Sequence, residues 1–156
     1  MSYERARDHL ERLGYADRIH LFDVSSATVE LAATALGCEP GHIAKSLAFS
    51  VLDSPVIILA AGNVKIDNSK YKHFFGQKAK MLSREDTELL TGHAVGGVCP
   101  FGVNNGVKIY TDVSLKNFDT VYPACGTSNS AVKFTPQELF EASFSIEWID
   151  VCKPRD

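Results

Sequence analysis

The sequence lacks the long apolar runs and paired cysteines on which membrane-spanning or cross-linked proteins depend. Its longest apolar run, Val56–Ala61, is far shorter than the roughly 20 residues that a spanning helix needs. The first residues carry no apolar leader, so a cytoplasmic location without a membrane partner is expected. Without a CxxC pair, a redox motif or zinc knuckle is excluded. We expect four free, buried or half-buried thiols: Cys38, Cys99, Cys125 and Cys152.

Signatures of metal and nucleotide sites are also missing. No two of the five histidines have the HxxxH or HExxH spacing of a zinc-binding helix. The segment Gly41–Ser46 ends in Lys-Ser but lacks the glycine before lysine that a nucleotide-triphosphate loop requires. The sequence therefore predicts a site that uses neither a metal nor a cofactor.

What is present is a chain of ordinary globular composition. Its 156 residues are 45% hydrophobic and 22% charged, which is enough to bury a core without disulfides or metals. No repeat, low-complexity tract or Pro/Gly-rich linker divides the sequence. We therefore predict a single domain over residues 1–156.

The charge is slightly negative overall but locally basic. The formal net charge of −3 argues against a general nucleic-acid coat. Between positions 65 and 80, however, five lysines are opposed by a single aspartate. This stretch is either a solvated helix face or a contact for a nucleic-acid backbone, because such contacts come from clustered Lys and Arg. The candidate tRNA-docking residues are Lys65, Lys70, Lys72 and Lys78.

Helical and strand-like segments are mixed along the chain. Apolar spacing and cap residues predict helices at residues 3–13, at Val29–Leu36 with a start near Ser25-Ser26, at Asp67–Phe75, after Ser83, and after Thr135. Strands are predicted at Ile19–Val24, Ile43–Val51, Val56–Ala61, Val107–Tyr110, Thr120–Tyr122, Ala131–Phe134 and Ser145–Ile149. Because the order is not a strict βαβ alternation, the expected fold is α/β with a mixed sheet flanked by helices.

Lys45 is the first candidate functional residue. It lies on the bulky apolar face of its predicted strand, between Ile43 and Leu47. A lysine there must lose hydration, which is costly unless it meets an anion or opens onto a cavity. The alternative is that its long stem reaches water. The functional interpretation is a cation at the floor of a pocket that holds a phosphate, carbonyl or carboxylate.

Two loops are rich in small residues. The segment Gly92–Gly102 holds four glycines and a proline, so its backbone can aim successive N–H groups at one oxyanion. The segment Tyr122–Ser130 can line a small pocket with hydroxyl, amide and backbone groups. Plain turn geometry explains either loop equally well. Cys99 has no evident base, so it is not the expected nucleophile.

Together these segments resemble the YbaK/ProX (also YbaK/EbsC) family of aminoacyl-tRNA editing domains. The matching stretches are Ile43-Ala44-Lys45-Ser46-Leu47, Gly96–Gly102, Ala124-Cys125-Gly126 and Thr135-Pro136-Gln137-Glu138-Leu139, in the family's order and spacing. The likeness covers roughly Ile19 to Trp148. It implies a compact α/β domain whose mixed sheet is strongly curved around a small pocket. It also implies trans-acting hydrolysis of the ester of mischarged tRNA, commonly tRNA for proline.

The resemblance also implies roles for single residues. Lys45 matches the essential lysine that engages the aminoacyl-adenosine end, and residues 96–100 match the GxxxP loop whose backbone faces the scissile carbonyl. The expected catalytic residues are therefore Lys45, Gly96, Gly97 and Val98. The expected substrate contacts are Ser46, Cys99, Pro100, Phe101, Cys125, Gly126 and Thr127.

The resemblance does not transfer the substrate of every branch. In members that act on cysteinyl-tRNA the late loop resembles Ser-Ala-Gly-Lys-Arg-Gly, whereas residues 124–129 here lack the basic pair. Another small side chain fits the pattern equally well. The expected partner is the acceptor end of an aminoacylated tRNA, with prolyl-tRNA synthetase as a further candidate.

The expected mechanism is metal-independent. Loop amides would stabilise the oxyanion, and a hydroxyl of the terminal ribose would orient water, as the resemblance implies. The rival hypothesis is a non-catalytic module that senses a free amino acid or nucleotide. A metal-dependent hydrolase is a third.

Overall fold

A four-stranded mixed sheet forms the centre of the computed structural model, which describes residues 2–155. Its strands are β2 (Ala44–Val51), β3 (Ser54–Ala61), β5 (Lys108–Asp112) and β7 (Trp148–Ile149), in the order β2-β3-β5-β7. The hairpin β2–β3 is antiparallel, and the pairs β3–β5 and β5–β7 are parallel. The predicted α/β fold with a mixed sheet is confirmed; strong curvature of the sheet stays a prediction.

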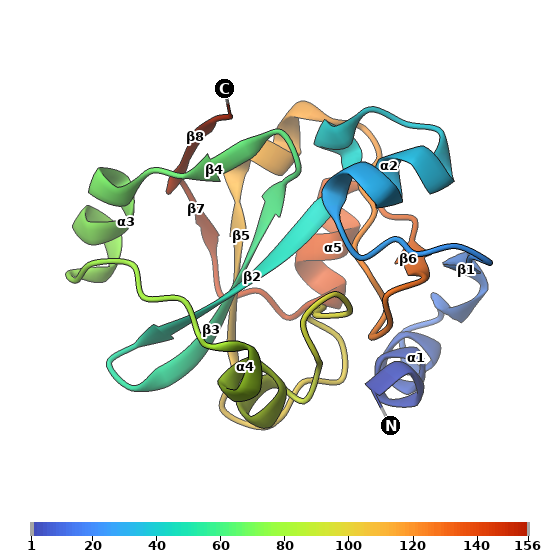
Figure 1. Cartoon of the computed structure of the whole chain (residues 1–156), viewed down its shortest axis with the longest axis horizontal. Helices are drawn as coiled ribbons and strands as arrows, with labels where there is room; N and C mark the ends of the chain where they lie inside the picture. Colours follow the sequence, from blue (N-terminus) through green and yellow to red (C-terminus); the bar gives the residue numbers. More distant parts are fainter. Residues whose placement is uncertain (1, 156) are drawn as a thin grey trace.

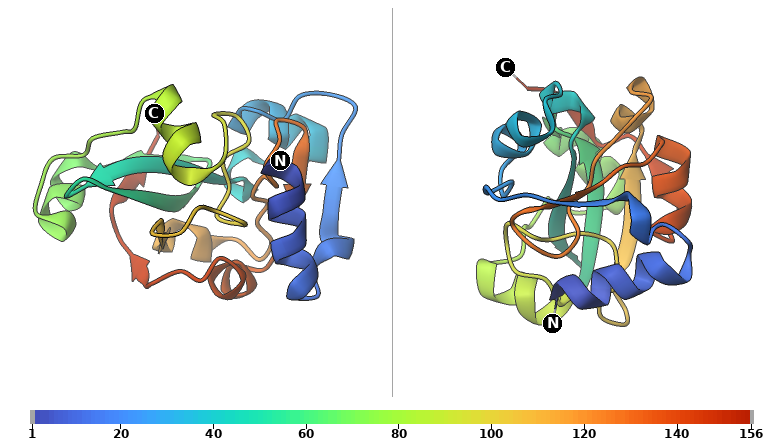
Figure 2. Two further views of the ribbon diagram at one scale, coloured as in Figure 1. Left: turned by 90° about the horizontal axis from the view of Figure 1, so that it is seen from below. Right: turned by 90° about the vertical axis from the view of Figure 1, so that its right-hand side faces the viewer.

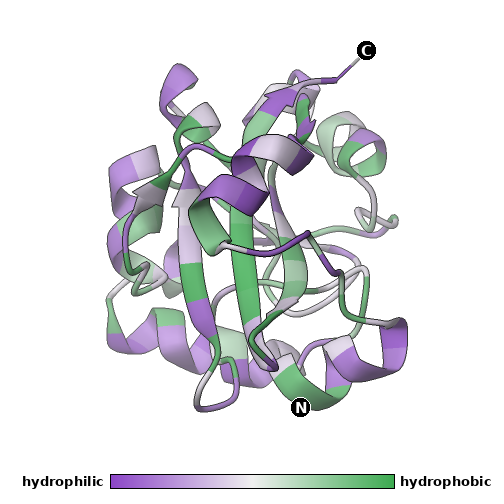
Figure 3. Cartoon of the chain, turned by 90° about the vertical axis from the view of Figure 1, so that its left-hand side faces the viewer, coloured by the Kyte–Doolittle hydropathy of each residue, from purple (hydrophilic) through white to green (hydrophobic). Residues whose placement is uncertain are grey.

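The strand β3 is apolar throughout because both of its faces are covered. Ile57 and Leu59 belong to one core, which includes residues of α1 (Ser2–Arg12) and α5 (Pro136–Ala142). Ile58 and Ala60 belong to a second core, to which Tyr71 of α3 (Asn68–Phe75) contributes. Strands coloured as hydrophobic lie at the centre of Figure 3, with hydrophilic stretches on the surrounding helices. A continuous apolar run is what a strand buried on both faces requires.

Two small antiparallel pairs extend this core. Strand β1 (Ile19–Leu21) pairs with β6 (Ser130–Val132), and β4 (Val64–Ile66) pairs with β8 (Cys152–Pro154). The sequence did not predict β4 or β8, because three residues are too few to show alternation. The strand predicted at Thr120–Tyr122 is wrong. That segment makes only the single bridges Ile43↔Tyr122 and Val121↔Phe134, because it crosses between two separate partners.

Most helix ends follow their cap residues. Thr28 starts α2 (Val29–Leu36) by accepting the Leu31 N–H at 3.1 Å, so the predicted start near Ser25-Ser26 is too early. Asp67 caps α3, and Ser83 caps α4 (Arg84–Thr91). Thr135 and Glu138 form the reciprocal capping box that the sequence predicts for α5. Three short 3₁₀ helices complete the described part of the chain, at Ala16–Arg18, Pro40–His42 and Val113–Asn117.

The elements around β2 position the candidate site. In Figure 1 the helix α3 lies at one end of the molecule, whereas α1, α2 and α5 lie toward the other. Figure 2 shows α4 and the loop that follows it beside the hairpin, on the side opposite α5. Over residues 2–155 none of the helices has the length and apolar character needed to cross a membrane.

Candidate functional site

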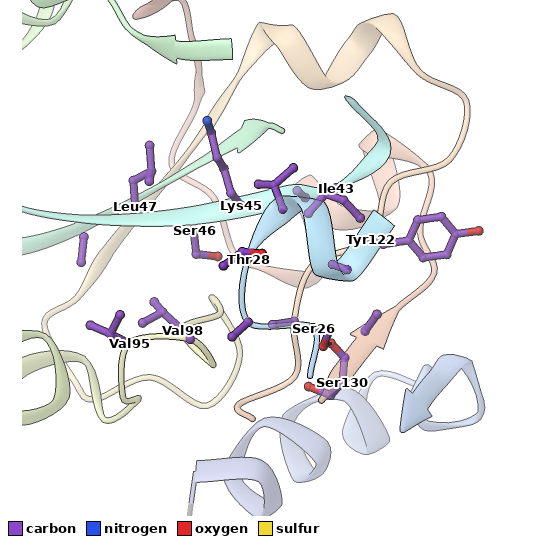
Figure 4. Close-up of a pocket in the computed structure, with 18 of the residues that line it drawn as sticks. Ser26, Thr28, Ile43, Lys45, Ser46, Leu47, Val95, Val98, Tyr122 and Ser130 are labelled. Atoms are coloured by element: carbon purple, nitrogen blue, oxygen red, sulfur yellow. Dashed lines mark hydrogen bonds between the residues drawn. The ribbon is translucent and has the colours of Figure 1, made fainter. Parts of the chain in front are cut away.

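A cavity of about 330 Å³ lies along the outer edge of β2. Its volume falls in the range of small-molecule sites, about 300–1,000 Å³. Its walls come from β2, the start of α2, residues of α4 with the segments before and after it, and β6 with the segment that precedes it (Figure 4). The lining side chains are mainly apolar, and the polar or charged ones are Ser26, Thr28, Lys45, Ser46, Thr87, Tyr122 and Ser130.

Lys45 and Ser46 extend from opposite faces of β2. In Figure 4 Ser46 points toward Thr28 and the loop that carries Val95 and Val98, whereas Lys45 points the other way. This follows from the two-residue period of a strand. Both residues border the cavity because β2 is the edge strand of its sheet. Successive side chains of β2 thus point to opposite faces, as predicted for this strand, and this places Lys45 and Ser46 on different sides of it.

The ammonium group of Lys45 is held beside β4. The side chain is half-buried, and Nζ donates a hydrogen bond to the carbonyl oxygen of Val64. Burial lowers the pKa of Lys45, the neighbouring positive charge of Arg155 lowers it further, and the Glu30 carboxylate opposes this shift. The structure thus brings Lys45 and the glycine loop to one cavity, but the ammonium is turned away from the loop.

The glycine loop is packed tightly against residues 126–127. Gly97 has so little space that an added Cβ would lie 2.8 Å from the Thr127 nitrogen. The Gly97 N–H donates to Ala94 O at 3.0 Å, so this amide closes the turn. Gly96, with φ at +100°, and Val98 line the cavity. Within residues 2–155 neither of their N–H groups has a hydrogen-bond partner. Two of the three predicted oxyanion donors therefore remain available.

Several predicted substrate contacts are core residues instead. Cys99, Phe101 and Cys125 are fully buried in the main core and do not line the cavity. Pro100 and Gly126 are also buried outside the lining, and Thr127 hydrogen-bonds Asn129. The physical reason is that the chain turns inward after Val98 and packs beneath α1. Of the predicted contacts only Ser46 borders the cavity.

The thiol of Cys99 is poorly suited to nucleophilic attack. It is fully buried, and burial raises its pKa far above the ordinary value. It lies 3.6 Å from Nε2 of His93, but that nitrogen also contacts Phe101 O at 2.7 Å. Burial lowers the pKa of His93. Cys99 and His93 therefore pack within the core, where a substrate cannot reach them.

Sequence reasoning predicted Ser46 and the segment Tyr122–Ser130 at the site, but it did not single out Ser26, Thr28 or Thr87 of the cavity wall. Ser26 Oγ donates to Ser128 O at 3.3 Å, and Ser130 Oγ donates to Thr127 O at 3.1 Å. These hydroxyls are satisfied and hold the wall together. Ser46 differs, because its buried Oγ has no partner in the described part of the chain. A buried polar atom of this kind needs an explanation, and a ligand is one.

The predicted docking lysines lie in β4, in α3 and just after α3; in Figure 1 α3 lies at the end of the molecule away from α2, and β4 lies between them. All four are exposed: Lys65, Lys70, Lys72 and Lys78. Lys70 is 3.1 Å from the Asp150 carboxylate and 3.0 Å from Cys152 O. Lys72 and Lys78 border a separate hollow of about 490 Å³.

No metal-binding cluster was found in the described part of the chain. Within residues 2–155 no group of three or more His, Cys, Asp or Glu side chains could hold an ion.

The chain is similar in sequence to two kinds of curated protein. The chain is 50% identical over 154 residues to the uncharacterized protein YwhH of Bacillus subtilis strain 168, with 98% of both chains covered. It is 35% identical over 95 residues to a proline–tRNA ligase of Limosilactobacillus fermentum. That alignment covers 57% of this chain but only 17% of the ligase, so the chain matches a small part of that protein.

A similar fold occurs in solved structures. A crystal structure described as a "putative trans-editing enzyme for prolyl tRNA synthetase" has a TM-score of 0.88 and 30% identity, with 97% of each chain covered. The hypothetical protein APE2540 shares the fold, with a TM-score of 0.85. A family model for the aminoacyl-tRNA editing domain matches residues 24–142. The resemblance drawn from these sequence motifs is thus confirmed, and the chain belongs to the family of aminoacyl-tRNA editing domains.

Proposed function

We propose that this protein hydrolyses, in trans, the ester bond of mischarged tRNA, with tRNA for proline carrying a small amino acid as the preferred substrate. The observation that carries the proposal is the cavity at the edge of β2. It combines two loop amides that have no hydrogen-bond partner within residues 2–155 with a half-buried lysine. Membership of the editing-domain family supports the same reaction.

The proposed reaction needs one water molecule. Its oxygen attacks the ester carbonyl carbon, the bond to the ribose oxygen breaks, and that ribose oxygen receives the proton. The N–H groups of Gly96 and Val98 stabilise the negative charge on the carbonyl oxygen, and one such donor is worth about 10²–10³ in rate. Lys45 exchanges Val64 O for a phosphate or carbonyl oxygen of the terminal aminoacyl-adenosine. The neighbouring ribose hydroxyl orients the water.

Positioning replaces a protein nucleophile in this proposal. Cys99 is too deeply buried to reach the carbonyl, and the serine hydroxyls of Ser26 and Ser130 are already bonded to backbone oxygens. A precisely held ester and water can supply a large part of the rate without a covalent intermediate. The exposed lysines around α3 would hold the phosphate backbone of the acceptor arm.

A deacylation panel tests the reaction. Alanyl-, cysteinyl-, seryl- and prolyl-tRNA are incubated with the protein, and free amino acid is measured. We expect turnover of at least one mischarged species. Lys45→Ala should reduce it by a hundredfold or more, whereas Lys108→Ala, which removes an exposed lysine at the start of β5, should not. Tight binding without release would favour the sensor hypothesis. Loss of turnover on adding EDTA would favour a metal-dependent hydrolase.

Salt dependence tests the docking lysines. Each lost phosphate contact should flatten the plot of log affinity against log salt by about 0.7–0.9. The double variant Lys72→Ala/Lys78→Ala should therefore lower the slope by about 1–2. Lys108→Ala again serves as the control, with an unchanged slope. If the double variant kept the parental slope, the patch around α3 would not be the docking surface.

A further inference from the structure

The outer edge of β2 is paired at both ends and open in between. At one end the Ala44 N–H donates to Tyr122 O at 3.1 Å, and Tyr122 N–H donates to His42 O at 2.8 Å. At the other end the Leu82 N–H donates to Ala48 O at 3.0 Å, and Ser50 N–H donates to Lys80 O at 2.9 Å. The open part of the edge is therefore centred on a single residue, Ser46.

The register of the hairpin fixes which groups face this opening. In an antiparallel pair, both backbone groups of alternate residues point to the same neighbour. The bonds at the two ends of the edge involve even-numbered residues, so Lys45 and Leu47 direct their groups to β3, opposite Ala60 and Ile58. Ser46 must then direct both its N–H and its C=O away from β3.

These two groups of Ser46 face the cavity without a partner. Residues on both sides of the opening, Tyr122 and Leu82, line the same cavity as Ser46. No hydrogen bond from the Ser46 N–H or to the Ser46 C=O is found within residues 2–155. Backbone groups shielded from solvent are almost always paired. The side-chain Oγ of the same residue is buried and unpartnered as well, which is a second, independent sign of a ligand.

The charges and hydrogen-bonding groups of the cavity walls limit the kinds of ligand that the cavity can bind. Among residues 2–155, every residue that lines the cavity is neutral except Lys45, so no carboxylate of this part of the chain borders it. A bound ammonium group would have to donate to carbonyl or hydroxyl oxygens. The Ser46 C=O and Ser46 Oγ are two such acceptors, and an ammonium carries three N–H donors. The adjacent Ser46 N–H can donate to a carbonyl oxygen.

We propose that the backbone of Ser46 binds the α-amino ester of the substrate as if it were one residue of an added β-strand. The α-ammonium donates to Ser46 C=O, and the ester carbonyl oxygen accepts from Ser46 N–H. This pairing recognises the α-amino ester, which all aminoacyl groups share, in the same way that strand addition recognises the main chain of a peptide. It rests on the proposed function, and it adds a Ser46 N–H to the two loop amides as a donor to the reacting oxygen.

Non-hydrolysable ligands test the pairing without requiring turnover. The probes are 3′-alanylamido-3′-deoxyadenosine and its des-amino analogue, the 3′-propionylamido compound. On ¹⁵N-labelled protein, the Ser46 amide should shift downfield and become protected from hydrogen exchange when the alanyl compound binds. The Ala44 amide is already bonded to Tyr122 O and should stay protected throughout. Because a hydrogen bond to a charged group is lost, the propionyl compound should bind about 10- to 100-fold more weakly.

Each outcome separates the inference from the proposed function. Equal affinities, or an unmoved Ser46 amide with the alanyl compound bound, would overturn the pairing even if the tRNA panel shows turnover. A shifted Ser46 amide with the expected affinity difference supports the pairing even if no tRNA is hydrolysed. Ser46→Ala keeps the backbone groups, so it should retain the preference for the alanyl compound; loss of that preference would assign the recognition to the hydroxyl and reject the backbone pairing.

Discussion

The substitution Gly97→Ala tests whether the glycine loop must lie where the structure places it. The added Cβ would lie 2.8 Å from Thr127 N and 2.9 Å from the Gly126 carbonyl carbon and oxygen. All of these are backbone atoms, so no flexible side chain can move aside. The two segments would have to separate by about 0.6 Å to reach the 3.4 Å of an ordinary contact. Overpacking of this kind costs about 1–3 kcal/mol.

The loss of stability and the loss of activity can be measured separately. For a chain of this length, 1–3 kcal/mol corresponds to a fall in Tm of about 3–10 °C. Because misplacement by 1 Å can cost a hundredfold in rate, we expect a shift of about half that to reduce deacylation roughly tenfold. Urea unfolding and a single-turnover deacylation assay give the two quantities. The displaced donors are the amides of Gly96 and Val98.

A glycine outside the cavity provides the matched control. Gly106 has φ at +91° and open space around a built Cβ, so Gly106→Ala adds backbone strain without crowding. Strain of this type costs about 1–3 kcal/mol. We therefore expect Gly106→Ala to lose comparable stability while its deacylation rate stays unchanged. A Gly97→Ala protein with parental stability and rate would refute the placement of the loop against residues 126–127.

Three further predictions concern stability. Tyr71→Phe removes a fully buried hydroxyl that has no hydrogen-bond partner among residues 2–155, so the free energy of unfolding should rise by about 1 kcal/mol. The half-buried Tyr110→Phe is the control, and a decrease for Tyr71→Phe would mean that its hydroxyl is bonded. His9 accepts a hydrogen bond from Gly102 N–H at 2.9 Å, and burial lowers the pKa of His9. The neutral imidazole therefore stabilises the fold above about pH 6.5, and this contribution is lost as the pH falls through the lower pKa of the folded state. The pH dependence between 7 and 5 should weaken in His9→Gln, and equal slopes would contradict this role. Thr135→Ala should cost about 1 kcal/mol in urea unfolding, because it removes half of the capping box.

Elements with strong local signals were predictable from the sequence. The strand β3 is apolar at every position from 56 to 61, and α5 opens on a cap residue, a proline and an acid. The pair β4–β8 was not predictable, because its two three-residue strands lie far apart in the chain and each supplies only half of the pairing. The segment 120–122 has the composition of a strand, but its partners change from one residue to the next.

The candidate site was predictable in its parts but not in its geometry. Lys45, Ser46, Gly96 and Val98, which the motifs singled out, all line one cavity, and their roles stay predictions. Residue type alone could not distinguish a loop residue that faces a ligand from one that turns inward. Cys99 and Phe101 were for this reason predicted as substrate contacts, although they are buried in the core. The open edge at Ser46 depends on which backbone groups have partners, and those partners come from segments about 35 and 75 residues away.

The short opening in β2 also bears on solubility. A long unpaired strand edge can recruit a second chain and seed aggregation. Here the segments at Tyr122 and Leu82 cap the edge on both sides and leave room for about one residue, so an extended polypeptide cannot align along it. Variants that detach either cap should therefore be examined for self-association as well as for activity, because the same exposed backbone would then be long enough to template a cross-chain sheet.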